Sequence, residues 1–154
     1  MIDTSKGFAI HRTFAASPDE IWSAWTDADA VAQWWHPPGA STPRESVEID
    51  AKVGGHYIYT MVNDASGDSV VTGGIYQEVV PSERLAFTWG YPDGDPADTP
   101  IVSITLEEVD GSTSMTFDLR GVDGTKGDGY YYDGWEGVLV SLEGYLDSHH
   151  AGAA

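Results

Sequence analysis

The stretch FAASPDEIWSAW, residues 14–25, contains the signals that begin a helix directly after an extended segment. Ser17 stands one residue before Pro18 and three residues before Glu20, which is the spacing of a capping box. In that arrangement the serine hydroxyl accepts a hydrogen bond from the first turn, and the glutamate accepts one from the serine backbone. The sequence therefore predicts a helix that starts at residue 18.

The flanking residues predict a strand before this helix and a second short helix after it. Large side chains alternate with smaller or polar ones over residues 8–14, which is typical of a strand. The stretch Thr26-Asp27-Ala28-Asp29 has the character of a break and a second cap, and it precedes an apolar pair, Val31 and Trp34. Two prolines at 37–38 then exclude further helix, because proline removes a backbone donor and clashes with the preceding turn.

Residues 44–119 predict an antiparallel meander of about six strands. Gly, Pro, Asp and Ser separate short runs in which apolar side chains take every second position. The alternate positions carry mostly threonine and serine, so we expect one covered face and one wet face, with Thr88 on the wet one. The apolar positions are Tyr57, Tyr59, Met61, Leu85, Phe87, Trp89, Val102, Ile104, Leu106, Met115 and Phe117.

The element that covers the apolar face of the sheet is expected near the end of the chain, where apolar residues recur at spacings of three and four. This pattern predicts an amphipathic helix of about four turns. A glycine-rich loop, residues 121–129, leads into it and is interpreted either as a flexible flap or as a plain surface loop. Residues 149–154 are expected to fray. The apolar helix positions are Trp135, Val138, Leu139, Leu142, Tyr145 and Leu146.

These elements predict an α+β fold with two short helices after the first strand and a long helix at the end. A length of 154 residues fits one domain, spanning 1–154 with its core at about 7–148. The 7 Lys and Arg residues face 25 Asp and Glu residues, and the formal charge of -18 opposes attraction to nucleic acid or to anionic lipid.

The sequence also excludes several chemistries. It holds 0 cysteines, which excludes disulfides, cysteine-ligated zinc, iron–sulfur clusters and thiol nucleophiles. No apolar run approaches the roughly 18 residues of a membrane span. The first seven residues lack the apolar segment of a secretory signal, so the expected location is the cytoplasm.

The order of elements resembles the helix-grip fold of the START-like (SRPBCC) superfamily. Particular motifs are similar to its AHSA-type branch, which is named after an activator of a heat-shock ATPase, and they span about residues 7 to 148. They are Phe14-Ala15-Ala16-Ser17-Pro18, Trp34-Trp35 before Pro37, Gly54-Gly55 before an aromatic strand, Gly74-Ile75-Tyr76-Gln77-Glu78 before Pro81, and Asp133-Gly134-Trp135. The resemblance implies a curved antiparallel sheet that wraps around the long helix.

The resemblance further implies a cavity between sheet and helix that binds or sequesters a hydrophobic or aromatic small molecule. Some relatives trap reactive natural products such as enediynes, so a role in natural-product biosynthesis or self-resistance is one interpretation. A polyketide aromatase or cyclase using the same cavity is the enzymatic alternative. A co-chaperone-type protein-interaction domain is the second alternative. Activation of the chaperone itself is disfavoured, because that activity resembles a two-domain protein and this chain matches only the later domain.

Aromatic side chains on the predicted inner face are the candidate ligand contacts, because such pockets are mostly apolar with few orienting polar groups. Filling of the core by the same rings is the competing interpretation. The candidates are Trp34, Trp35, His36, Tyr57, Tyr59, Met61, Tyr76, Phe87, Trp89, Tyr131, Trp135 and Leu139.

No catalytic set, metal site or cofactor is predicted. His11 and His56 fall on the wet faces, and no histidine or carboxylate spacing matches a zinc or facial-triad motif. If the protein is an enzyme, the candidates are Tyr59, Glu78 and Arg12. Glu78 shares the parity of Tyr76 and is expected to point inward, either as an acid or base or as the partner of an arginine such as Arg84 or Arg12.

Two glycines on the long helix, Gly137 and Gly144, lie seven residues apart. Glycine inside a helix lowers helix stability by about 1 kcal/mol relative to alanine, so we expect a structural reason for the pair. Close approach of a second chain, which makes a homodimer, is one hypothesis; tolerance within a well-packed helix is the other.

Overall fold

A computed structural model describes residues 3, 5–36, 39–92, 94–129 and 131–152. The predicted helix stop at Pro37–Pro38 and the last two residues of the predicted tail lie outside this range. The helices are α1 (Pro18–Thr26), α2 (Ala28–Trp34) and α3 (Tyr131–Gly152), with single turns η1 (Arg44–Ser46) and η2 (Pro96–Asp98). The strands are β1 (Gly7–Phe14), β2 (Ala40–Ser41), β3 (Glu48–Ile49), β4 (His56–Asn63), β5 (Ser69–Val80), β6 (Arg84–Thr88), β7 (Ile101–Val109) and β8 (Ser112–Arg120).

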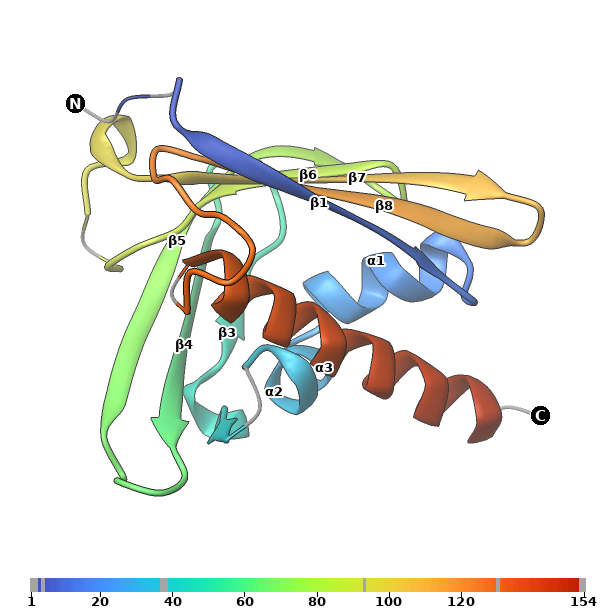
Figure 1. Cartoon of the computed structure of the whole chain (residues 1–154), viewed down its shortest axis with the longest axis horizontal. Coiled ribbons are helices and arrows are strands. Elements are labelled where there is room, and N and C mark those ends of the chain that lie inside the picture. The colour runs from blue at the N-terminus through green and yellow to red at the C-terminus, as the bar shows by residue number, and fades with distance from the viewer. Residues whose placement is uncertain (1–2, 4, 37–38, 93, 130, 153–154) are drawn as a thin grey trace.

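The strands form one antiparallel sheet in the order β1-β8-β7-β6-β5-β4-β2, and β3 also pairs with β4. The sheet bends around α3, so that β1 and β6 to β8 pass over the helix while β4 and β5 pass beside its start (Figure 1). This confirms the predicted α+β, helix-grip-like fold. Strands β3 to β8 are the six strands of the predicted meander, and β2, which lies ahead of it, was not predicted because two residues are too few to show alternation.

The predicted caps at the two short helices are confirmed. The Ser17 hydroxyl accepts from the Glu20 N–H at 3.2 Å, and the Ser17 N–H donates to Glu20 Oε1 at 3.3 Å. Asp27 ends α1 by donating its N–H to the Ser23 carbonyl, and its carboxylate starts α2 by accepting from the Asp29 N–H at 3.0 Å. The break between the helices therefore turns α2 back toward the sheet and α3.

The apolar face of α3 is buried against the sheet as the spacing predicts. Leu139 and Leu142 are fully buried, and Trp135 is 4% exposed. With 22 residues the helix has about six turns rather than four, because it begins at Tyr131, ahead of the apolar pattern, and continues beyond it. Gly144 is exposed and would meet no atom within 4 Å as alanine, and the homodimer stays a prediction.

Glu78 does not point into the molecule, which corrects the expectation from parity. The register of β5 against β6 shifts between Tyr76 and Glu78, so the residue after the shift loses the inward parity. The Glu78 carboxylate bonds Arg84 Nε, and both side chains are more than two-fifths exposed. Because Arg84 also donates to Thr105 on β7, the group is an ion pair that braces three strands at the surface.

Thr88 is buried, not on a wet face as expected. Its hydroxyl accepts from the Ile75 N–H at 2.8 Å, and its carbonyl accepts from the Tyr57 hydroxyl at 2.6 Å. A side chain at Gly74 would lie 1.9 Å from that carbonyl, so only glycine allows the two strands to approach this closely. Thr88 thus joins β4, β5 and β6 just before the chain reaches Trp89.

Removal of the first cap is expected to destabilise the fold. Ser17→Ala should lower the free energy of unfolding by about 1 kcal/mol, because the first turn of α1 loses its acceptor. Ser23→Ala is the matched control, since Ser23 is exposed inside the same helix, and it should change stability by no more than about 0.5 kcal/mol. Urea unfolding measures both; equal stability of the two variants would contradict the capping role.

Candidate functional site

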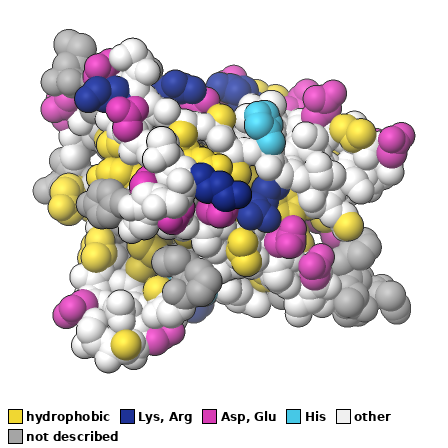
Figure 2. Space-filling view, viewed as in Figure 1, with side chains coloured by type: hydrophobic (Ala, Val, Ile, Leu, Met, Phe, Trp, Pro, Cys, Tyr) yellow, Lys and Arg dark blue, Asp and Glu magenta, His cyan; other side chains and the backbone are white. Residues whose placement is uncertain are grey.

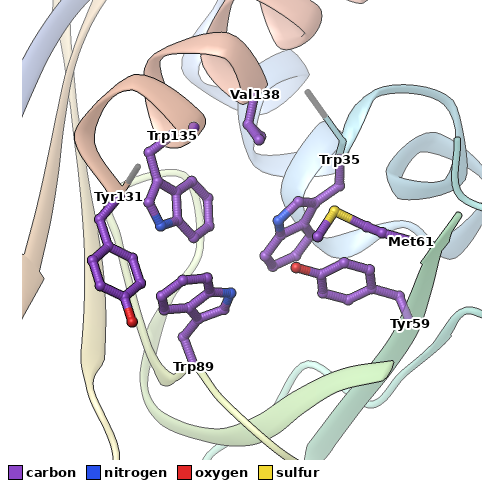
Figure 3. Close-up of a pocket in the computed structure, with 8 residues that line it drawn as sticks. Trp35, Tyr59, Met61, Trp89, Tyr131, Trp135 and Val138 are labelled. Atoms are coloured by element: carbon purple, nitrogen blue, oxygen red, sulfur yellow. The ribbon is translucent and has the colours of Figure 1, made fainter. Parts of the chain in front are cut away.

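A cavity of about 120 Å³ lies between the start of α3 and the inner face of the sheet (Figure 3). Its wall comes from four segments: the end of α2, the strand β4, the residue after β6, and the first two turns of α3. The lining residues are Trp35, Tyr59, Met61, Trp89, Tyr131, Gly134, Trp135 and Val138. Because five of them are aromatic, the cavity is shaped mainly by flat, rigid rings.

Secondary structure explains why these side chains converge. On α3 the spacing of Tyr131, Gly134, Trp135 and Val138 places all four on one face of the helix. On β4, Tyr59 and Met61 are two residues apart and so point the same way. The close-up shows the tryptophan and tyrosine rings of these segments facing a common space (Figure 3).

Trp35 is held rigidly at the back of the cavity. Its ring stacks on that of Trp34, with centroids 5.8 Å apart and planes at 6°, and it lies 4.7 Å from the Tyr59 ring. Trp34 is fixed in turn, because its indole N–H donates to the Ala24 carbonyl at 2.8 Å. The buried Thr42 hydroxyl donates to the Trp35 carbonyl at 3.0 Å and so fastens the backbone as well.

The start of α3 is fixed by two carboxylates. Asp128 accepts from the N–H groups of Tyr132 and Asp133, each at 3.2 Å, which caps the helix. Asp133 reaches back and accepts from the N–H groups of Gly127 and Gly129, at 2.8 and 2.7 Å. The glycine-rich loop is thus tied to the helix that carries Tyr131 and Trp135; its motion as a flap stays a prediction.

None of the eight lining residues has a side chain that is charged at neutral pH. Burial raises the pKa of the Tyr59 hydroxyl well above its usual value, and the neighbouring Trp89 and Thr72 side chains only partly offset this rise. Tyr59 is therefore a neutral phenol at any physiological pH. The indole nitrogens of Trp89 and Trp135 are both buried; that of Trp89 interacts with the Tyr59 hydroxyl, whereas that of Trp135 makes no hydrogen bond among the described residues.

A second hollow of about 520 Å³ adjoins the cavity. Trp89 and Tyr131 line both, with ring centroids 6.0 Å apart, so these two side chains stand between them. The outer hollow also includes Val70 and Val71 of β5, which are 54% and 43% exposed. An apolar surface therefore continues outward from the cavity.

The structure brings together half of the residues predicted to bind a ligand. Trp35, Tyr59, Met61, Trp89, Tyr131 and Trp135 line the cavity. The five candidates Trp34, Tyr57, Tyr76, Phe87 and Leu139 lie in the buried core outside its wall, where at most 2% of each is exposed. Gly134 and Val138 were missed as site residues, although the helical spacing from Tyr131 and Trp135 points to both. Contact of any of them with a ligand stays a prediction.

The three candidates for an enzymatic role do not meet at the cavity. Tyr59 lines its wall, whereas Glu78 pairs with Arg84 at the surface of the sheet. Arg12 faces the far part of α3, with its guanidinium 3.9 Å from the Glu143 carboxylate. Their joint use as an acid–base set therefore gains no support from the geometry.

The histidines on β1 and β4 lie where the alternation places them. His11 and His56 are exposed, and His11 bonds the Thr116 hydroxyl at 3.0 Å. His36 is half-buried, with Nδ1 3.1 Å from the Thr42 hydroxyl. Because that hydroxyl gives its proton to Trp35, His36 Nδ1–H must be the donor in this contact.

The described ranges contain no group of three or more His, Asp or Glu side chains placed to hold a metal ion. In the same ranges, no helix has the length and apolar character needed to cross a bilayer. Acidic side chains are spread across the face seen in Figure 2 and do not gather in one patch.

Comparison with known proteins places these observations in a family. The family model described as Activator of Hsp90 ATPase homolog 1-like protein matches residues 15–147. A solved structure from Chromobacterium violaceum is 29% identical, with 90% of this chain and 96% of that chain covered and a TM-score of 0.77. An AHSA1 protein from Silicibacter pomeroyi is 25% identical, with coverage of 94% and 99% and a TM-score of 0.77.

A structure from Nitrosomonas europaea is 21% identical, covers 97% of this chain and 99% of its own, has a TM-score of 0.79, and shows the fold alone. The search of curated protein sequences finds no match to this chain.

His36 should make stability depend on pH. Burial lowers its pKa below the usual 6.5, with a smaller opposing effect from Asp64. The unfolded chain therefore takes up this proton first, so the free energy of unfolding falls as pH drops below about 6.5. His36→Asn removes this titration and should lose less stability than wild type between about pH 7.5 and about pH 5.5. Urea unfolding at both pH values measures this; parallel losses would show that His36 does not contribute.

Proposed function

This chain belongs to the Activator of Hsp90 ATPase homolog 1-like family, and on that premise we propose that it binds a hydrophobic, aromatic small molecule in the cavity behind α3. The observation that carries the proposal is the unfilled space among five aromatic rings. Protein interiors are close-packed and leave few voids larger than a water molecule. The space among these rings therefore favours a ligand pocket over simple filling of the core.

The size of the cavity suits one ring directly. An engineered apolar cavity of about 150 Å³ holds benzene, and the present one is close to that volume. A larger ligand would extend past Trp89 and Tyr131 into the outer hollow, where Val70 and Val71 supply further apolar surface. The natural-product role in biosynthesis or self-resistance is a finer proposal that rests on the resemblance to START-like relatives.

The alternatives have less support. An aromatase or cyclase needs an acid or base beside the ligand, and of the three candidates only Tyr59 lines the cavity. A protein-interaction role needs a large exposed apolar patch, whereas the exposed apolar surface at Val70 and Val71 adjoins the cavity and fits a ligand that extends out of it. The formal charge of -18 argues against nucleic acid, and the cytoplasmic location stays a prediction.

A ligand screen tests the proposal directly. The purified chain is heated with a panel of flat aromatic metabolites and polyketides, and quenching of tryptophan fluorescence checks each hit, since Trp35, Trp89 and Trp135 surround the cavity. A ligand at about 100 times its dissociation constant should add about 2.7 kcal/mol to stability. Saturable shifts with quenching support the proposal, and the absence of both across a chemically broad panel contradicts it.

A pair of glycine variants on α3 locates the site. Both Gly134 and Gly144 would meet no atom within 4 Å as alanine, so each variant should stabilise the helix by up to about 1 kcal/mol. The added methyl at Gly134 occupies the cavity wall, whereas that at Gly144 faces solvent. Gly134→Ala should therefore weaken binding of a screen hit by about tenfold or more, and Gly144→Ala should leave it unchanged. Calorimetric titration measures the affinity of both variants. Equal affinities for the two would show that the ligand binds outside this cavity.

A further inference from the structure

Strand β5 has a free edge over its first four residues. The strand pairs with β4 over residues 69–75 and with β6 over residues 76–80, and a single bridge joins Gly73 to Gly90 just after β6. Ser69–Thr72 therefore pair with β4 alone, and no strand among the described residues lies on their other side. Figure 1 shows this part of β5 at the outside of the sheet.

A proline explains why the pairing stops there. Gly73 and Gly90 exchange two main-chain hydrogen bonds, at 2.9 and 3.2 Å. An antiparallel ladder would continue with Val71 opposite Pro92, two residues farther along each chain. Because Pro92 has no N–H to donate, the ladder ends at the bridge, and the chain turns away.

Alternation along the strand determines which groups of the free edge point outward. Gly73 directs its N–H and C=O toward Gly90, so those of Val71 and Ser69, two and four residues earlier, point to the same side. Neither residue has a main-chain partner on that side among the described residues. The edge thus offers two donors and two acceptors in the spacing of a strand, and such an edge is a template for another strand.

The outer hollow lies beside this edge and gives room for a further strand. Val70, Val71 and Thr72 form one side of the hollow, and the chain from Trp89 to Pro100 contributes the other. A paired strand lies about 4.8 Å from its neighbour, so a strand added to β5 would enter this space. The exposed side chains of Val70 and Val71 are available to pack against it.

The charges around the hollow favour a basic partner. Asp95 and Asp98 line it, and Asp68 comes directly before the free edge. No lysine, arginine or histidine is among its described lining residues. The formal charge of -18 opposes pairing of two copies of this chain, whereas it attracts a segment that carries Lys or Arg.

We propose that the free edge of β5 binds an extended, positively charged segment of another protein, which joins the sheet beside Ser69–Thr72. Main-chain hydrogen bonds give the affinity in this mode of recognition, so it does not need a large apolar patch. A single ring in the cavity behind α3 leaves the edge open. The proposal therefore goes beyond the proposed function and does not rest on it.

Amide exchange, followed in nitrogen-15 NMR spectra, tests the proposal on the wild-type chain. The probe is a short capped peptide in which valine alternates with lysine. At saturation the Val71 N–H should exchange about tenfold more slowly, because it gains an acceptor, while the Val70 N–H, which faces β4, should stay within about twofold. Two control peptides carry glutamate in place of lysine, or a methyl group on every main-chain nitrogen, and neither should protect Val71.

A pair of variants tests the edge from the protein side. Val71→Pro removes an N–H that points away from β4, a position at which edge strands tolerate proline. Val71→Thr is the matched control, because it keeps both the N–H and the branched shape. Calorimetric titration with the lysine peptide should show affinity lower by about tenfold in Val71→Pro and by no more than about twofold in Val71→Thr. Equal affinities of the two variants would contradict main-chain pairing.

The remaining outcomes are equally decisive. Failure of the lysine peptide to bind or to protect Val71, or equal binding of the methylated peptide, overturns strand addition. Equal binding of the glutamate peptide overturns the basic partner. Protection of Val71 without peptide, together with a dimer in light scattering, shows that a second copy occupies the edge and also overturns the proposal. Because benzene binding in the cavity is measured separately, none of these results decides the proposed function.

Discussion

The packing of Trp35 between the sheet and α3 is the contact on which the site depends. Its ring lies 4.7 Å from Tyr59 on β4 and 6.2 Å from Trp135 on α3, so it links both walls of the cavity. Three local interactions place Trp35 there: the capping box at Ser17, the shared helix cap at Asp27, and the hydrogen bond from the Thr42 hydroxyl to the Trp35 carbonyl. Each fixes backbone direction, and together they leave the ring little freedom.

Rigid rings explain why a space remains beside such a packed core. Aliphatic side chains can change rotamer to fill a gap, whereas an indole or phenol must move as one plane. At the back of the cavity Trp34, Trp35 and Tyr57 pack closely, with adjacent centroids 5.8 and 5.6 Å apart. At the front, Trp89 and Tyr131 meet edge to face and leave the gap behind them.

Much of this arrangement could be predicted from local sequence. The capping spacing at Ser17 and Glu20 fixes the start of α1, and the recurrence from Trp135 to Leu146 identifies the buried face of α3. The apolar parity of β4 places Tyr59 and Met61 inward, because alternation along an uninterrupted strand follows directly from its pleat. These features depend on neighbours within a few residues.

The predictions that were wrong depend on contacts between strands, which the periodicity of the sequence does not reveal. The register shift after Tyr76 turns Glu78 outward, and the close approach of Gly74 to Thr88 buries a threonine expected in water. The division of the aromatic residues between core and cavity follows from sheet curvature, so Tyr57 and Phe87 pack inside while Trp89 lines the space. Gly134 has no side chain, so only its helical spacing from Tyr131 and Trp135 points to it, and its lack of bulk helps to open the cavity.

The central claim is that the space between α3 and β4 is accessible to an aromatic ring. Its most direct test is the detection of magnetisation transfer in NMR from benzene protons to assigned methyl groups of the protein. The account predicts intermolecular signals to the Met61 and Val138 methyls, which line the cavity, and none to the buried Ile104 and Leu119 methyls, which do not. Signals confined to exposed methyls such as those of Val53, or no signals at saturating benzene, would contradict it.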